Sequence, residues 1–172
     1  MIVFLIGYMG CGKSTVGEIL ANKIQYRFMD FDNYLEDSIG MSITETFKQK
    51  GEIFFRKQEY LHLEKLLELD HYVVALGGGT PCYGDNITRL TGANNAKVIY
   101  LKASVNTLTD RLYPEKSKRP LISHLDSKEA LNDFIRKHLF ERNYYYNQAQ
   151  ATINIDNLTP QQVADNIIEI LS

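Results

Sequence analysis

The sequence predicts an α/β fold in three layers, α/β/α, with helices on both faces of a central parallel sheet of five strands. Short apolar, β-branched runs alternate with stretches of helical spacing, and these stretches are long enough to connect parallel strands. The expected strands are Ile2–Ile6, Arg27–Asp30, Tyr72–Leu76, Lys97–Leu101 and Ala151–Ile155. With 172 residues and no repeat, linker or low-complexity run, residues 1–172 are expected to form a single domain.

The expected helices lie near residues 13–24, 34–39, 43–50, 52–69, 104–112, 127–147 and 160–171. Two of them begin at clear capping signals. Ser42-Ile43-Thr44-Glu45 has the pattern of a capping box, and Thr159-Pro160 places a cap residue before a proline at the first helical position.

One long stretch, Tyr113–Ser123, shows neither a helical nor a strand pattern. Its prolines at positions 114 and 120 disfavour a helix. Loops of this length in compact domains are commonly lids or binding loops. We therefore expect a mobile lid at about residues 113–123.

The loop after the first strand is the most informative segment. Gly7-Tyr8-Met9-Gly10-Cys11-Gly12-Lys13-Ser14 matches the pattern G-x-x-x-x-G-K-[ST]. In this P-loop pattern, backbone N–H groups surround phosphates, the lysine reaches the β- and γ-phosphates, and the hydroxyl binds Mg²⁺. An apolar run precedes the loop, and apolar residues follow it at helical spacing, which is the required context. The sequence therefore predicts a nucleoside-triphosphate site that includes Gly10, Cys11, Gly12, Lys13, Ser14 and Thr15.

A dinucleotide site is excluded, and a GTPase site is not favoured. A dinucleotide fingerprint starting at Gly10 would need glycine at position 15, where the chain has Thr15. No Asn-Lys-x-Asp element for reading guanine is present, since Asn22-Lys23-Ile24-Gln25 lacks the acid. Neither a redox cofactor nor a GTP switch is expected.

The composition limits the environment and the partners. The formal net charge of −2 gives no basic footprint for nucleic acid or a membrane surface. No stretch approaches the roughly 20 apolar residues of a membrane span, and no basic segment of a signal peptide precedes the first strand. The only cysteines, Cys11 and Cys82, each lie in a glycine loop, which favours a reducing compartment and a cytoplasmic location. The histidines show no ligand spacing and are expected to be ordinary surface or core residues: His62, His71, His124 and His138.

Two carboxylates, Asp30 and Asp32, stand at the end of the second strand. Residues two apart on an extended chain project to the same side, and the carboxyl ends of parallel strands form the ligand crevice. An ATP-using enzyme needs one acid in the Mg²⁺ shell and another near the acceptor hydroxyl. A helix-capping pair in a turn is the alternative interpretation. No other expected strand ends in an acid, which favours the functional one.

Three consecutive glycines, Gly77-Gly78-Gly79, follow the third strand. Glycine loses more conformational freedom on folding than any other residue, and a tight turn needs only one or two. We therefore expect the backbone here to approach a ligand closely.

Six motifs in this order resemble the shikimate kinases, and the resemblance covers nearly the whole chain. They are Gly7–Ser14, Asp30-x-Asp32, Phe54-Phe55-Arg56, Gly77-Gly78-Gly79, Arg119-Pro120-Leu121 and Glu141-Arg142. The resemblance implies a P-loop kinase of the nucleoside-monophosphate-kinase type. Such an enzyme transfers the γ-phosphate of ATP to the 3-hydroxyl of shikimate in aromatic amino acid biosynthesis, with Mg²⁺ as cofactor.

On the nucleotide side, the resemblance implies that Lys13 and Ser14 serve ATP and Mg²⁺ and that Asp30 belongs to the metal shell. Arg119 swings in from the lid and, with Lys13 and Asp32, is a catalytic candidate. Two further positions match residues that flank adenine in the family, namely Arg111 and Pro160.

On the acceptor side, the resemblance implies that Asp32 contacts the shikimate hydroxyls, and that Gly78 and Gly79 line the pocket. Arg56 and Arg142 grip the carboxylate, as suits bidentate guanidinium groups. Glu59, one helical turn after Arg56, can pair with it and fix its orientation. The substrate-binding region is expected at about residues 32–61.

Some features depart from the family pattern. The lid segment is rich in lysine, and Tyr144-Tyr145-Tyr146 is unusually aromatic, which we interpret mainly as helix packing. Two alternatives stay open: another small-molecule P-loop kinase, acting on gluconate or a nucleoside monophosphate, and an ATP-binding regulator without catalysis. Asp30, Asp32 and Arg119 speak against the regulator. The expected partners are ATP and shikimate, with no nucleic acid or membrane, and the chain is expected to be a monomer.

Overall fold

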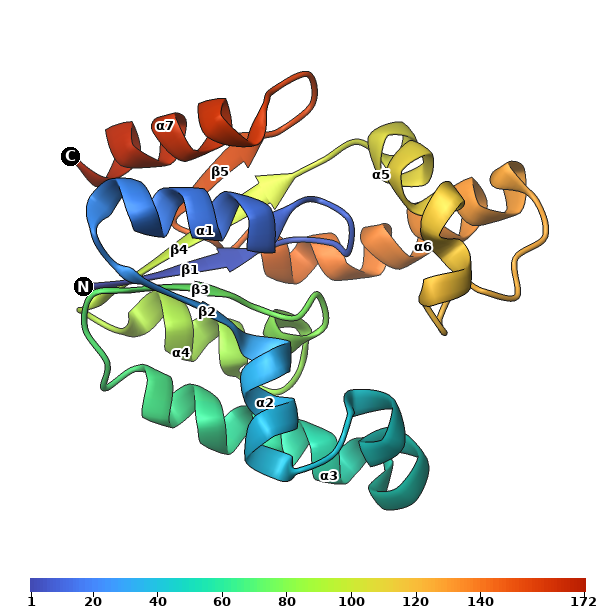
Figure 1. The fold of residues 1–172 in the computed structure, drawn as a ribbon, viewed down its shortest axis with the longest axis horizontal. Coiled ribbons are helices and arrows are strands. Elements are labelled where there is room, and N and C mark those ends of the chain that lie inside the picture. Colours follow the sequence, from blue (N-terminus) through green and yellow to red (C-terminus); the bar gives the residue numbers. More distant parts are fainter.

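The computed structural model describes residues 1–172 and contains one five-stranded sheet in the order β2-β3-β1-β4-β5 (Figure 1). All four pairings are parallel. The strands are β1 Ile2–Ile6, β2 Arg27–Asp30, β3 Tyr72–Ala75, β4 Ala96–Lys102 and β5 Ala151–Asn154. The predicted fold class is confirmed, and each predicted strand is present with ends that differ by at most one residue.

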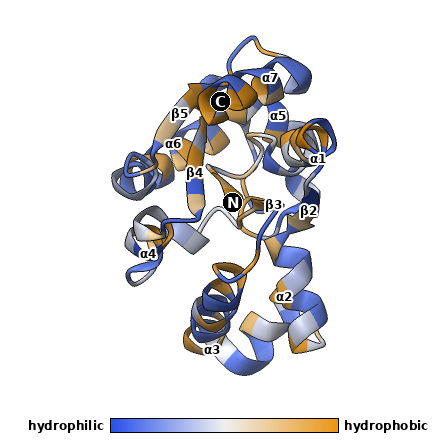
Figure 2. Ribbon diagram, turned by 90° about the vertical axis from the view of Figure 1, so that its left-hand side faces the viewer, coloured by the Kyte–Doolittle hydropathy of each residue, from blue (hydrophilic) through white to orange (hydrophobic).

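Seven α-helices and two 3₁₀ segments complete the fold. The helices are α1 Lys13–Ile24, α2 Phe31–Ile39, α3 Ile43–Leu66, α4 Asn86–Gly92, α5 Val105–Leu112, α6 Lys128–Tyr146 and α7 Pro160–Leu171. The 3₁₀ segments are η1 Thr80–Cys82 and η2 Tyr113–Lys118. Helices α1 and α7 pack together on one face of the sheet, and α4 and α6 lie on the other (Figures 1 and 2).

The central strand β1 is completely buried, because helices cover both of its faces and strands flank both of its edges. Ile2 aligns with Tyr72 of β3 on one side and with Ala96 of β4 on the other. All five of its residues are 0% exposed, which explains their continuous apolar run. The chain passes from β3 on one side of β1 to β4 on the other, and the crevice at the carboxyl end of β1 is the expected ligand position in such a sheet.

Helix α4 was not predicted. Its seven residues include asparagine, two threonines and an isoleucine, which are weak helix formers. Only Ile87 and Leu90 mark its apolar face, and both are buried. Tertiary packing against β4 stabilises a segment too short for its periodicity to be read from the sequence.

The predicted boundaries of two other helices need correction. Helix α2 begins at Phe31 rather than near residue 34, and the second half of α3 ends at Leu66 rather than near residue 69. The predicted break between helices 43–50 and 52–69 is present, because Gly51 (φ 82°) interrupts the helical geometry of α3. Both predicted caps are present, at Ser42 and at Thr159.

The expectation that Tyr113–Ser123 contains no helix was wrong, because η2 occupies Tyr113–Lys118. Pro114 stands in the first turn of η2, where a missing N–H group is tolerated. Two contacts tether the segment: Ile122 is fully buried, and Lys116 Nζ donates to the Leu125 carbonyl at 2.6 Å. The mobility expected of this lid stays a prediction.

Candidate active site

The phosphate loop has the backbone geometry that its glycines allow. Gly7, Gly10 and Gly12 have φ values of 147°, 82° and 93°, which favour glycine. Gly12 is the N-cap residue of α1 and supplies no side-chain hydrogen bond. The first N–H groups of α1 are therefore available to an anion, and the helix dipole favours one there.

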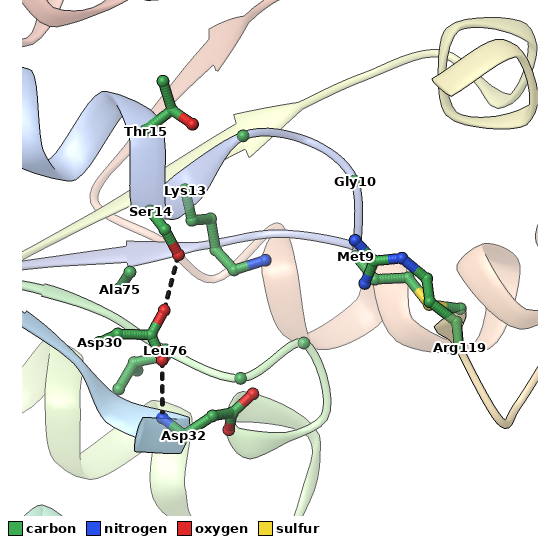
Figure 3. A pocket seen from close by; sticks show the side chains of 13 residues that line it. Met9, Gly10, Lys13, Ser14, Thr15, Asp30, Asp32, Ala75, Leu76 and Arg119 are labelled. Carbon is green, nitrogen blue, oxygen red and sulfur yellow. Dashed lines mark hydrogen bonds between the residues drawn. The ribbon is translucent and has the colours of Figure 1, made fainter. Parts of the chain in front are cut away.

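The loop borders a cavity of about 350 Å³ (Figure 3). Most of the predicted nucleotide-binding residues line it, together with the two acids and the lid arginine: Gly10, Gly12, Lys13, Ser14, Thr15, Asp30, Asp32 and Arg119. Lys13 Nζ donates to the carbonyls of Gly7 at 2.9 Å and Tyr8 at 3.2 Å. The side chain of Cys11 is buried and packs against Gly7, consistent with a small spacer.

Asp30 both caps a helix and contacts the phosphate loop. Its Oδ1 accepts hydrogen bonds from the backbone N–H groups of Asp32 (3.1 Å) and Asn33 (3.2 Å) at the start of α2. Its Oδ2 accepts a hydrogen bond from Ser14 Oγ at 2.6 Å. The capping interpretation is therefore confirmed for Asp30, and its place in the Mg²⁺ shell stays a prediction.

The predicted proximity of Asp30 and Asp32 is present, but the reason given for it was wrong. The chain is extended only as far as Asp30, and Asp32 lies in the first turn of α2. Both side chains still line the cavity, because α2 begins at the carboxyl end of β2 and turns Asp32 toward the glycines after β3 (Figure 3).

The carboxyl group of Asp32 is tuned toward neutral pH. Burial, and after it the negative charges of Asp30 and Glu59, raise its pKa from 3.8 to about 6 against the opposing effect of Lys13. A group that exchanges a proton with substrate works best when its pKa lies near the working pH.

The residues predicted to hold Mg²⁺ fit that ion. Ser14 Oγ and Asp30 Oδ2 lie 2.6 Å apart at the edge of the phosphate cavity. Mg²⁺ prefers oxygen ligands and is usually held by one or two carboxylates together with waters and substrate phosphates. The structure contains no group of three or more His, Cys, Asp or Glu side chains suited to a metal, so an all-protein metal cage is not formed.

A second cavity of about 770 Å³ adjoins the first and shares Met9, Asp32 and Arg119 with it. Arg56 of α3 and Arg142 of α6 both line this second cavity. These two arginines are 86 residues apart in the chain, and the fold brings them to one place.

Arg56 is held in a fixed orientation. Its Nη1 donates to Glu59 Oε1 at 2.5 Å, as the sequence spacing predicted. Glu59 is buried and also accepts a hydrogen bond from the Thr80 hydroxyl. On the other side, the Arg56 guanidinium lies 3.6 Å from the centre of the Tyr83 ring. The charge of Arg56 is therefore positioned by groups that leave one edge of the guanidinium for a ligand.

Arg142 has no carboxylate partner within 4.0 Å, unlike Arg56. Its guanidinium lies 5.7 Å from the centre of the Tyr8 ring. A partly buried cation with an aromatic neighbour and no acid partner is suited to bind an anionic ligand.

The three glycines allow these side chains to approach the backbone. A Cβ atom at Gly78 would lie 3.1 Å from Arg142 Nη1, and one at Gly79 would lie 3.1 Å from Arg56 Nη2. At Gly77 it would lie 2.6 Å from Asp32 Oδ1. None of the three has a positive φ, so the requirement is one of space. We expected a ligand to approach the backbone closely here. In this structure, the side chains of Asp32, Arg56 and Arg142 approach it instead.

The other predicted residues vary in their placement. Arg119 lies 3.7 Å from Glu115 through Nη2 and borders both cavities. Arg111 Nη1 donates to the Gly10 carbonyl at 3.2 Å, which places Arg111 against the phosphate loop. Pro160 begins α7 and lines neither cavity.

Two site residues were not predicted. Tyr83 covers Arg56 and donates through its hydroxyl to Glu52 at 2.9 Å, but nothing in its local sequence indicates this. His138 lines the second cavity, although it was expected to be ordinary. Its spacing of four residues before Arg142 on a helix was the available signal. The packing expected of Tyr144-Tyr145-Tyr146 is found for Tyr146, which is buried and donates to the Gly78 carbonyl at 2.6 Å, but not for Tyr144, which is exposed.

A P-loop, two acids at its edge and an adjoining cavity with two arginines define a phosphotransferase that moves a phosphoryl group to a small anionic acceptor. A model of the shikimate kinase family matches residues 9–172. The chain belongs to the shikimate kinase family, and it is an ATP-dependent kinase of that family.

Individual relatives agree with this assignment. The chain is 45% identical to shikimate kinase of Flavobacterium johnsoniae, with 99% of this chain and 98% of that one covered. Among solved structures, shikimate kinase from Bacteroides thetaiotaomicron matches with a TM-score of 0.90 and 32% identity over 99% of this chain and 98% of that one. Shikimate kinase from Acinetobacter baumannii in complex with shikimate matches with a TM-score of 0.82 and 29% identity over 99% and 92%. None of the helices is both long and apolar enough to cross a membrane.

Proposed function

We propose that this chain transfers the γ-phosphate of ATP to the 3-hydroxyl of shikimate, giving shikimate 3-phosphate and ADP, with Mg²⁺ as cofactor. The observation that best supports the proposal is the position of Asp32. It lies between a phosphate cavity that contains Lys13 and a second cavity that contains Arg56 and Arg142. A ligand with one carboxylate and several hydroxyls suits that arrangement of charges.

On the donor side, the loop N–H groups and Lys13 bind the phosphates, and Ser14 and Asp30 hold the Mg²⁺ ion. When bound, the ion neutralises charge that develops on the phosphate oxygens. Arg111 of α5, whose side chain contacts the phosphate loop, borders the nucleotide. Pro160, at the start of the helix packed on α1, is the weaker adenine contact because it lines neither cavity.

On the acceptor side, Arg56 and Arg142 bind the carboxylate, and Gly78 and Gly79 leave room for their guanidinium groups. Asp32 accepts a hydrogen bond from the reacting hydroxyl and takes up its proton as the new P–O bond forms. Because phosphoryl transfer passes through a loose transition state, positioning and charge stabilisation matter more than base strength. A carboxyl group with a pKa of about 6 is sufficient for that role.

Arg119 is proposed to stabilise the phosphoryl group during transfer. It borders both cavities, and its only ion pair, at 3.7 Å with the half-exposed Glu115, is weak. Small movements of its long side chain would bring the guanidinium to the junction of the cavities. The expected catalytic set is therefore Lys13, Asp32 and Arg119.

We further propose a cytoplasmic location and a monomeric state. Both cysteines are free, which supports a reducing compartment. All of the proposed site residues come from one chain, so no second copy is needed to complete the site. Light scattering of the purified protein tests whether it is a monomer.

An ADP-release assay tests the proposed reaction. Shikimate, gluconate and nucleoside monophosphates are each offered with ATP, with and without Mg²⁺. We expect rapid, Mg²⁺-dependent ADP release with shikimate alone. Arg142→Ala should need about ten- to a hundredfold more shikimate for this response, while the control Arg136→Ala, an exposed arginine on the same helix, should respond as the wild type does. Turnover of a nucleoside monophosphate or gluconate in place of shikimate would overturn the proposal.

A further inference from the structure

The side chain of Tyr8 links the phosphate loop to helix α6. Tyr8 is 1% exposed, and its hydroxyl forms a hydrogen bond of 2.9 Å with His138 Nδ1. The two rings meet edge to face, with centres 5.4 Å apart. A buried hydroxyl requires a partner, and His138 is the one that this structure supplies.

The surroundings keep both partners of this hydrogen bond neutral. Burial raises the pKa of Tyr8 well above its usual range, so the phenol keeps its proton. Burial and the nearby charge of Arg142 lower the pKa of His138, so the imidazole is neutral at neutral pH. The hydrogen bond therefore joins two neutral groups, and the tautomer of the imidazole sets which of them donates.

Tyr8 also contacts both halves of the site. Its backbone carbonyl accepts a hydrogen bond from Lys13 Nζ at 3.2 Å, on the phosphate side. Its ring centre lies 5.7 Å from the guanidinium of Arg142, on the acceptor side. His138 and Arg142 are four residues apart on α6, and both line the acceptor cavity.

We propose that His138 is a positioning residue for phosphoryl transfer, which holds the Arg142 turn of α6 against the phosphate loop through its hydrogen bond with Tyr8. The inference rests on the proposed role of Arg142 in binding the acceptor carboxylate. This contact then helps to fix the distance between the phosphates and the bound acceptor, together with the hydrogen bond from Tyr146 of α6 to the Gly78 carbonyl. Reactions of this kind are sensitive to small errors in the distance between reactants.

Three variants test the contact. Tyr8→Phe removes one oxygen atom and keeps the packing, His138→Leu removes the hydrogen-bonding group of His138, and His138→Asn keeps a hydrogen-bonding group near the position of Nδ1. Exposed His124 supplies the control, as His124→Leu. KM and kcat for shikimate and ATP are measured for each variant, and shikimate Kd is measured by calorimetry.

We expect Tyr8→Phe and His138→Leu each to raise the shikimate KM and Kd about three- to tenfold, the usual effect of one lost hydrogen bond. The ATP KM should change less than twofold. The double variant should be no worse than either single one, because both remove the same interaction. His138→Asn and His124→Leu should stay within twofold of the wild type.

The outcomes separate this inference from the proposed function. An inactive wild type with shikimate means that the proposed function is wrong. An active wild type with an unchanged shikimate KM in Tyr8→Phe overturns the role of the contact. Effects that multiply in the double variant would also overturn it, because His138 would then act on the acceptor independently of Tyr8. Tyr8→Phe is the smallest of the changes, and its folding is checked by thermal unfolding.

Discussion

Replacing Asp32 by asparagine should make the protein more stable at neutral and alkaline pH while it removes most of the activity. Asp32 is largely buried, and its pKa is raised from 3.8 to about 6, first by burial and then by Asp30 and Glu59. Above pH 6 the side chain is charged in both the native and the unfolded chain, and the charge destabilises the native state. Asparagine has nearly the same shape without that charge.

The magnitude follows from the two pKa values. A tenfold change in an equilibrium constant corresponds to about 1.4 kcal/mol, so raising the pKa from 3.8 to about 6 costs the native state about 3 kcal/mol. This is an upper figure, since the side chain retains some contact with solvent. The cost is complete above pH 6, decreases as the pH falls from about 6 to about 4, and is absent below that, where both states are protonated.

Urea unfolding of the wild type and of Asp32→Asn between pH 4 and 8 measures this difference. Asp133→Asn is the control with the opposite sign, because hydrogen bonds from Lys137 and Arg136 lower the pKa of that exposed acid. In parallel, kcat of Asp32→Asn should fall about a hundredfold or more with ATP affinity retained, and wild-type kcat/KM for shikimate should decline below about pH 6. A variant that is less stable than the wild type at pH 8, or a stability gain that does not vary with pH, would refute the buried-charge argument.

Three other predictions concern the remaining groups of the site. Lys13→Met should abolish turnover in the ADP-release assay, because the loop fixes no other basic residue at the β- and γ-phosphates; appreciable residual turnover would contradict this role. Arg56→Ala and Arg142→Ala should each weaken shikimate binding by about ten- to a hundredfold, corresponding to roughly 1.5–3 kcal/mol, with little change for ATP; unchanged calorimetric titrations would remove them from the acceptor site. Arg119→Ala should lower kcat by something on the order of 10³-fold with shikimate affinity retained, and the segment 113–123 should resist protease when nucleotide and shikimate are bound. Equal cleavage with and without ligands, together with a normal kcat, would show that the segment is only a surface connection.

The sheet and the phosphate loop could be predicted because their signals are local. The apolar run of β1 and the spacing of the loop glycines need no information from elsewhere in the chain. Helix α4 could not be predicted, because its stability comes from packing against β4. Segment η2 was missed because Pro114 was taken to disfavour a helix, although proline is compatible with the first turn of a helix.

The site was predictable to the extent that motifs identify it. The resemblance to the family predicted that Arg56 and Arg142 bind the same carboxylate. Their spacing in the sequence alone gives no reason for two arginines of different helices to lie close together. The contact of Tyr83 with Arg56 depends on where η1 ends relative to α3, and the contact of His138 with Tyr8 depends on the position of α6 beside the phosphate loop. Such contacts between distant segments leave no periodic pattern in the sequence.

The parallel sheet places both ends of the chain on the side away from the phosphate loop. Met1 precedes the amino end of β1, and α7 runs back to the same side of the molecule, where both termini lie in Figure 1. A tether, fluorescent label or affinity sequence attached at either terminus would therefore point away from the two cavities. The enzyme could be fixed to a sensor surface through Ser172 with its cavities facing the solution, which gives direct access to association rates for nucleotide and acceptor.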